Sequence, residues 1–173
     1  SFLNAQPENQ FFCIYDFEDE LCEFNDVFTE HNGSLAICGR AYTNEREKAG
    51  FWLVETHGNG NLLWQDTFFP PEDRSWHCNA YSIIQSDDGG WVMGGVQTLP
   101  GGGESIRFAV TKVSEDREQL WWGNYGRGQW CCYAVIETKN QNILAGGQGC
   151  YAVMIDQDNG DIIWENEYDF SPI

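Results

Sequence analysis

Hydrophobic and polar positions alternate with a period of two along most of the chain, in short runs bounded by turn-forming residues. The clearest stretch predicts four strands, near residues 78–85, 91–97, 106–113 and 119–125. The sequences DDGG, LPGGGES and SEDRE lie between these runs and are rich in residues that favour turns. No segment shows a convincing helical period. The pattern therefore predicts an all-β protein.

The same pattern occurs three times, at an interval of roughly 50 residues. The three copies begin with CEFNDVFTEHNGSLAICG from Cys22, CNAYSIIQSDDGGWVMGG from Cys78 and WCCYAVIETKNQNILAGG from Trp130. Each copy continues with an apolar strand, a turn and a tryptophan, which is Trp64, Trp121 or Trp164. Four antiparallel strands in about 50 residues correspond to one blade of a β-propeller. We therefore predict a β-propeller-like fold with three blades.

The predicted blades occupy residues 21–69, 77–126 and 130–170 of a single repeat domain that spans residues 11–173, after an N-terminal extension at residues 1–10. Gly94-Gly95 and Gly146-Gly147 would allow the inner strands to approach each other closely. The three repeated tryptophans are expected to pack between neighbouring blades.

One arrangement recurs through the repeats: a DGG turn, a GG strand end, an apolar strand, an NG turn and a tryptophan. Its last part is clearest in DNGDIIW at residues 158–164. This arrangement resembles the repeats of the quinoprotein-like and related secreted β-propellers. The resemblance implies the fold and a docking role for the tryptophan. The resemblance implies no set of cofactor-binding residues and no particular activity.

An additional strand is predicted at residues 11–17, ahead of the first blade. It aligns with the last strand of the second blade, although it has no blade of its own. Its apolar residues are Phe11, Phe12, Ile14, Tyr15 and Phe17. Three blades are fewer than the four to eight that typically close a ring. The chain is therefore a fragment of a larger propeller, a subunit whose open ends are completed by other copies, or a distorted self-contained sheet.

The charge excludes several partners. The 173 residues include 27 acidic and 9 basic side chains, for a net charge of −18. Nucleic acid and anionic membrane surfaces would repel such a chain. Hydrophobic residues make up 42% of the sequence and aromatic residues 15%, which is enough for a core. No apolar run approaches the roughly 18 residues of a membrane helix, so membrane insertion is not expected.

Cysteine usage indicates an extracellular protein. The seven cysteines, Cys13, Cys22, Cys38, Cys78, Cys131, Cys132 and Cys150, lack the C-x-x-C spacing of a structural zinc site and are candidates for disulfides. The expected pairs are Cys22 with Cys38, and Cys131 or Cys132 with Cys150. Asn32 lies in a sequon at a predicted turn and is a candidate glycosylation site. The chain begins at Ser1 without a signal sequence, as a mature secreted product would.

The chemistry of a catalytic or metal site is not evident. The three histidines lack the spacing of a zinc site. Asp156, Asp158 and Asp161 are weak candidates for calcium, because the glycine and the fifth ligand of an EF-hand-like loop are out of register by one residue. A plain hairpin turn is the favoured interpretation there. No cofactor and no enzymatic activity are expected.

Three functional hypotheses remain. The first is a secreted, non-catalytic structural subunit that assembles with other copies of itself, as a filament or ring at a cell surface, through the strand at residues 11–17 and head-to-tail contacts. The second is a propeller module that binds carbohydrate or another ligand, with Trp76 and Trp130 as stacking residues. The third is a fragment of a larger propeller enzyme.

Overall fold

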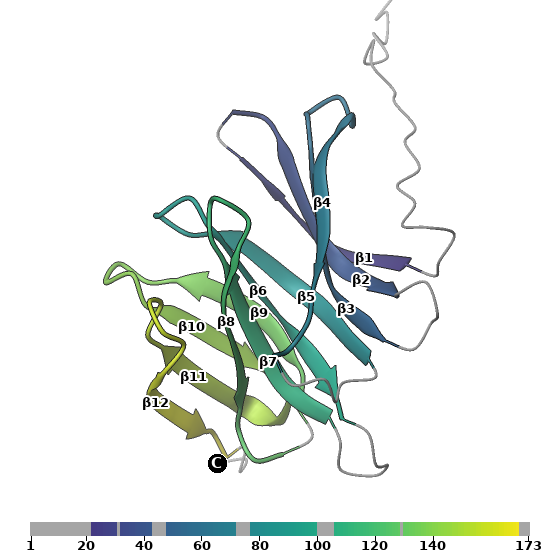
Figure 1. Cartoon of the computed structure of the whole chain (residues 1–173). Helices are drawn as coiled ribbons and strands as arrows, with labels where there is room; N and C mark the ends of the chain where they lie inside the picture. Colours follow the sequence, from purple (N-terminus) through teal and green to yellow (C-terminus); the bar gives the residue numbers. More distant parts are fainter. Residues whose placement is uncertain are drawn as a thin grey trace, which may run out of the picture.

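The computed structural model describes residues 22–30, 32–42, 48–71, 77–99, 106–128 and 130–169. Within them, twelve strands form three successive antiparallel meanders of four strands (Figure 1). The first meander contains β1 (Cys22–Thr29), β2 (Leu35–Tyr42), β3 (Ala49–Thr56) and β4 (Leu62–Phe68). The second contains β5 (His77–Gln85), β6 (Trp91–Thr98), β7 (Ile106–Val113) and β8 (Gln119–Tyr125). The third contains β9 (Cys132–Glu137), β10 (Ile143–Gly147), β11 (Tyr151–Ile155) and β12 (Ile162–Glu167), with the short 3-10 helix η1 (Gln148–Cys150) between β10 and β11.

The meanders are joined into two sheets. The first and second meanders form one eight-stranded sheet, in which β3 and β5 are parallel and meet only where Ala49 pairs with His77. The third meander is a separate four-stranded sheet in the order β12-β11-β10-β9. The predicted all-β class is confirmed, and the twelve strands fall four apiece within the three predicted repeats.

In each meander, tight hairpin turns of similar design connect the first strand to the second and the third to the fourth. In the turn from β5 to β6, the Ser86 amide donates to the Gly90 carbonyl and the Gly89 amide donates to the Ser86 carbonyl. Gly89 has a positive φ of 85°, which is the geometry of a three-residue hairpin loop with a left-handed residue at its end. The turn at Asp156–Asp161 is one residue longer, because the Gly160 amide reaches the carbonyl of Asp156.

A β-bulge in the first strand of each meander fixes a close approach to the second strand. The pairing skips Asn25 in β1, Tyr81 in β5 and Tyr133 in β9. Beside each bulge lies one of the repeated glycines Gly39, Gly95 and Gly147, where an added Cβ would lie 1.8, 2.0 and 2.0 Å from the carbonyl oxygen of Glu23, Asn79 and Cys131. No side chain fits at that distance. The glycines that identify the repeat in the sequence are therefore steric requirements of the bulge.

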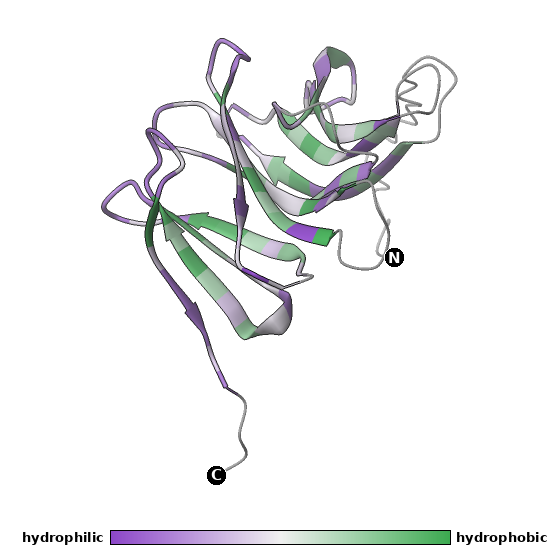
Figure 2. Ribbon diagram, turned by 60° about the horizontal axis from the view of Figure 1, so that its bottom comes forward, coloured by the Kyte–Doolittle hydropathy of each residue, from purple (hydrophilic) through white to green (hydrophobic). Residues whose placement is uncertain are grey.

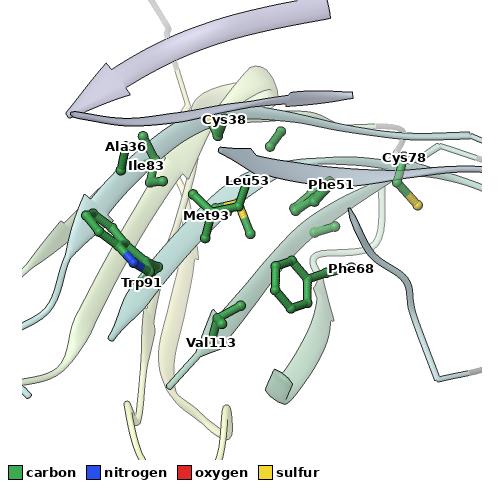
Figure 3. Close-up of a cluster of buried hydrophobic side chains, with 12 residues drawn as sticks. Ala36, Cys38, Phe51, Leu53, Phe68, Cys78, Ile83, Trp91, Met93 and Val113 are labelled. Atoms are coloured by element: carbon green, nitrogen blue, oxygen red, sulfur yellow. The ribbon is translucent and has the colours of Figure 1, made fainter. Parts of the chain in front are cut away.

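Most of the core lies between the meanders, and a smaller cluster of Ala41, Trp52 and Val54 belongs to the first meander alone. One buried cluster joins the first and second meanders and includes Phe51, Leu53, Trp91 and Met93 (Figure 3). A second joins the second and third meanders and includes Val92, Trp121, Ile143 and Val153. Figure 2 shows that hydrophobic residues are concentrated in the central strands and hydrophilic residues at the turns. Each meander therefore packs face to face on the next one along the chain.

Substituting Gly95 by alanine should destabilise the protein by about 1–3 kcal/mol or more, because the methyl group would collide with the Asn79 carbonyl oxygen. Gly146→Ala is the matched control, since the nearest atom to its new Cβ is 3.8 Å away. Urea unfolding of the two variants measures the difference. Equal stability of the two variants would show that the bulge adjusts to a side chain.

Candidate functional site

Three equivalent rows of residues cross the meanders, one on each. In each row four residues lie directly opposite one another on successive strands, and the last is the repeated tryptophan. We call them row 1 (Phe28, Ala36, Glu55, Trp64), row 2 (Ile84, Val92, Lys112, Trp121) and row 3 (Ile136, Leu144, Met154, Trp164). Because the register is the same in all three meanders, the rows occupy corresponding surfaces.

Row 1 is covered by the second meander. Glu55 is 9% exposed and accepts a hydrogen bond of 2.9 Å from the indole N–H of Trp91 and one of 3.0 Å from Arg117. The guanidinium carbon of Arg117 also lies 4.8 Å from the ring centroid of Trp64. Arg117 is the left-handed residue of the β7–β8 turn, with φ of 70°. A turn of the second meander therefore closes over the tryptophan of the first.

Row 2 is covered by the third meander in a corresponding way. Trp121 is 9% exposed, and its indole N–H donates to the Gln157 carbonyl at 2.9 Å. Gly160, which has a φ of 78°, lies against the Trp121 ring, since an added Cβ would be 2.9 Å from it. Gly160 thus takes the place over Trp121 that Arg117 takes over Trp64.

The charged residue of row 2 is also buried. Lys112 is 1% exposed and forms an ion pair with Asp88, which lies in the β5–β6 turn of the same meander. Desolvation tends to raise the pKa of Asp88, but hydrogen bonds from Lys112, Ser86 and the Gly90 amide together hold it below its ordinary value. The carboxylate therefore stays charged and compensates the buried ammonium.

Row 3 has no covering layer among the residues that the structure describes. Ile136 is 52% exposed and Trp164 is 39% exposed, whereas Trp121 at the corresponding place is 9% exposed. The glycines show the same contrast. A Cβ on Gly94, beside row 2, would lie 2.6 Å from the Cys132 sulfur of the next meander, but a Cβ on Gly146, beside row 3, would meet no atom closer than 3.8 Å. The third meander thus exposes row 3, although the equivalent rows 1 and 2 are buried within the chain.

The first strands of successive meanders also make equivalent contacts. The carboxylate of Asp26 accepts a hydrogen bond of 3.0 Å from the Ile83 amide, and the hydroxyl of Ser82 accepts one of 3.3 Å from the Val135 amide. The residue at the corresponding position of the third meander is the exposed Ala134, whose side chain has no acceptor. The meanders therefore contact one another in a repeated way at two places, beside the bulges of their first strands and at the tryptophans of their last strands.

The three repeated tryptophans lie in different surroundings. Trp64 and Trp121 pack between meanders, whereas Trp164 does not, because the described part of the chain places no further sheet beyond β9–β12. Sequence reasoning missed Glu55, Lys112 and Arg117. They are charged residues in strand or turn positions, and only the neighbouring layer gives them a role.

The cysteines are not brought together as expected. Cys22 pairs with Ala41 and Cys38 with Asp26, so about 13 Å of extended β1 separates Cys22 from the level of Cys38. A disulfide needs Cα atoms about 4.4–6.8 Å apart, so the register does not allow that pair. Cys38, Cys131, Cys132 and Cys150 are thiols, and the expected bridge from Cys131 or Cys132 to Cys150 is not formed.

Two of these thiols are shielded from reaction. Burial and the neighbouring Asp26 raise the pKa of Cys38 far above its ordinary value, and burial raises the pKa of Cys132 to about 12. Both therefore remain protonated near neutral pH and are poor nucleophiles.

The other candidate residues lie at the surface or outside the described residues. Asn32 is exposed in the β1–β2 turn, as a glycan acceptor must be. Asp156 and Asp158 lie in a hairpin turn, where the Asp156 carboxylate accepts the Asp158 amide at 2.9 Å, and Asp161 closes that turn. No group of three metal-ligating side chains occurs in the described ranges, and no helix there is long and apolar enough to cross a membrane. The strand predicted at residues 11–17, with Cys13, and Trp76 fall outside the described residues.

Similarity to known proteins is found among solved structures. No protein-family model and no curated protein matches the chain. A solved structure of PorZ, described as an essential bacterial surface component of the type-IX secretion system of Porphyromonas gingivalis, aligns with a TM-score of 0.46 and 9% sequence identity. The alignment covers 83% of this chain and 21% of PorZ, so the chain spans about a fifth of that structure's length.

Truncating the two equivalent tryptophans should have different effects on stability. Trp121→Ala is expected to cost about 3–5 kcal/mol, because it leaves a cavity between two meanders and removes the hydrogen bond to Gln157. Trp164→Ala should cost less than about 1 kcal/mol, because its side chain is already exposed to solvent. The free energy of unfolding of each variant, measured in dilute solution, tests this. A large loss in Trp164→Ala would mean that another part of the chain covers row 3.

Proposed function

We propose that this chain is a non-catalytic structural subunit of β-propeller-like architecture, in which the meanders act as blades and other copies of the chain continue the stack. One observation carries the proposal: rows 1 and 2 are each buried by the next meander, while the equivalent row 3 is open. Exposed apolar rows of this kind mark interaction sites on soluble proteins. The natural occupant of row 3 is a further meander.

A second copy can supply that meander from its N-terminal end. The turns that close over Trp64 and Trp121 contain a left-handed residue, Arg117 or Gly160. The corresponding turn of the first meander contains Gly60, with φ of 82°. Val27 of the first meander is 56% exposed and lies next to Asp26, so apolar surface is also present at that end. Contact between row 3 of one copy and the first meander of the next is head to tail, which generates a ring or a filament.

Strand complementation is the second part of the proposal. The apolar strand predicted at residues 11–17 has no repeat of its own, and addition of a strand to a sheet edge in another copy would satisfy its backbone hydrogen bonds. The outer strand β12 is exposed at every position from Ile162 to Glu167 and offers such an edge. The strand and row 3 would then act at the same junction.

An extracellular or cell-surface location accompanies this role. It is supported by the exposed sequon residue Asn32. The net charge of −18 does not favour nucleic acid or anionic lipid as partners.

Gly146→Val tests the head-to-tail contact. The added side chain enters open space in the single chain, so unfolding should be unchanged, but it would block a meander that packs on row 3 as Cys132 packs on Gly94. Sedimentation velocity over a range of concentrations, with negative-stain electron microscopy, should show rings or filaments for the natural chain and monomers for the variant. Trp164→Ser should also dissociate the assembly, whereas Leu120→Ser, at a residue that is 50% exposed elsewhere, should not.

Two results would contradict the proposal. A natural chain that remains monomeric at high concentration would exclude self-assembly. Association of Gly146→Val equal to that of the natural chain would exclude row 3 as the contact. Deletion of residues 1–17 tests strand complementation separately, since undiminished assembly of that variant would show that the strand is not required.

A further inference from the structure

A pocket of about 210 Å³ opens between the end of the second meander and the last strand of the third. It is lined by Gly126, Arg127, Trp130, Tyr151, Glu165 and Glu167. Tyr151 belongs to the buried cluster between these two meanders, and Glu167 is its directly paired neighbour on β12. The pocket is therefore on the opposite face of the third meander from row 3.

The Trp130 ring is held in a fixed position. An added Cβ on Gly126, Gly128 or Gly149 would lie 2.8, 2.3 or 2.4 Å from the nearest indole atom, so these glycines form a slot for the indole that leaves no room for side chains of their own. The Tyr151 ring lies 4.9 Å away, between centroids, at an interplanar angle of 33°. An aromatic ring that is already immobilised loses little entropy when a ligand stacks on it.

The polar groups of the pocket are arranged around these rings. The Tyr151 hydroxyl donates to a Glu165 carboxylate oxygen at 2.5 Å. Burial raises the pKa of Tyr151 well above its ordinary value, and the hydrogen bond and the negative charge of Glu165 raise it further, so the hydroxyl stays protonated and keeps Glu165 in place. Arg127 and Glu167 are exposed at the rim. The pocket thus offers N–H donors from a guanidinium and acceptors from two carboxylates.

We propose that this pocket binds a single neutral sugar ring. The apolar face of a pyranose stacks on an aromatic plane, and its hydroxyl groups both donate and accept hydrogen bonds, which Glu165, Glu167 and Arg127 match. A volume of about 210 Å³ is below the roughly 300–1,000 Å³ of pockets for drug-sized ligands, which limits the occupant to about one ring.

Anionic ligands fit the pocket less well. An anion would meet two carboxylates and the field of a chain with a net charge of −18. A cation would be attracted by the two carboxylates and the aromatic rings but would meet the guanidinium of Arg127 at the rim, so choline is a competitor that the binding measurements include. A zwitterionic amino acid, with one charge of each sign, is the closest competitor, and binding measurements distinguish it from a sugar.

The experiment uses the full chain and saturation-transfer NMR with isothermal titration calorimetry. The ligands are the methyl glycosides of glucose, galactose and mannose, N-acetylglucosamine, leucine and choline. We expect at least one of the sugars to bind in the millimolar range, and neither leucine nor choline to do so. Arg127→Ala and Glu167→Gln should each raise the Kd about tenfold or more. The matched controls Lys139→Ala and Glu118→Gln remove charges from exposed turns and should leave the Kd unchanged.

Three results would overturn the proposal: no binding of any sugar, binding of leucine or choline in place of the sugars, or sugar binding that Arg127→Ala and Glu167→Gln leave unaltered. The monomeric Gly146→Val variant should bind sugar as the natural chain does, because Gly146 is not among the residues that line the pocket. Failure of assembly and failure of sugar binding can therefore be told apart.

Discussion

The structure depends on the fact that each four-stranded meander is apolar on both faces. In β3 all eight residues are buried, and in β6 all but the last are. Alternate residues of a strand point to opposite faces, so such strands need a packed layer on each side. A single meander cannot satisfy this requirement alone. In the described residues the chain meets it at two junctions, where the second meander covers the first and the third covers the second.

The close packing of the layers follows from a small set of backbone features. The bulges at Asn25, Tyr81 and Tyr133 bend the first strands, and the glycine beside each bulge removes the side chain that would prevent the bend. Gly94 then allows the next meander to approach, with Cys132 and Val135 in the space that its side chain would occupy. The bulge glycine thus shapes each layer, and Gly94 also sets the fit between the second and third meanders.

The sequence predicted the parts of the fold that are encoded locally. Alternation with period two predicted the strands, and the recurrence of Gly39, Gly95 and Gly147 predicted the repeats. The hydrogen bonds of Glu55 were beyond such reasoning, because its partners Trp91 and Arg117 lie in another repeat. The proposed Cys22–Cys38 pair assumed a register that brings the two residues to the same level. The hairpin and its bulge instead place Asp26 opposite Cys38.

The pocket was only partly accessible to sequence reasoning, for the same reason. Trp130 was recognised as an aromatic residue near a loop end. The other lining residues Tyr151, Glu165 and Glu167 lie 21 to 37 positions later in the sequence. They come near Trp130 only when the third meander packs on the second. The glycine slot around Trp130 is likewise assembled from both sides of that junction, from Gly126 and Gly128 before it and Gly149 after it.

The composition of row 3 is consistent with a surface that is exposed in a single chain and buried in an assembly. Rows 1 and 2 place a charged residue on the third strand, and each needs a partner when it is covered: Glu55 binds Trp91 and Arg117, and Lys112 binds Asp88. The corresponding residue of row 3 is Met154. Burial of an unpaired carboxylate or ammonium costs a large desolvation free energy, whereas burial of an uncharged thioether does not. The thioether side chain also adapts its shape to a new neighbour more readily than a branched side chain. Row 3 can therefore pass from solvent to an interface without requiring a charged partner in the opposing layer.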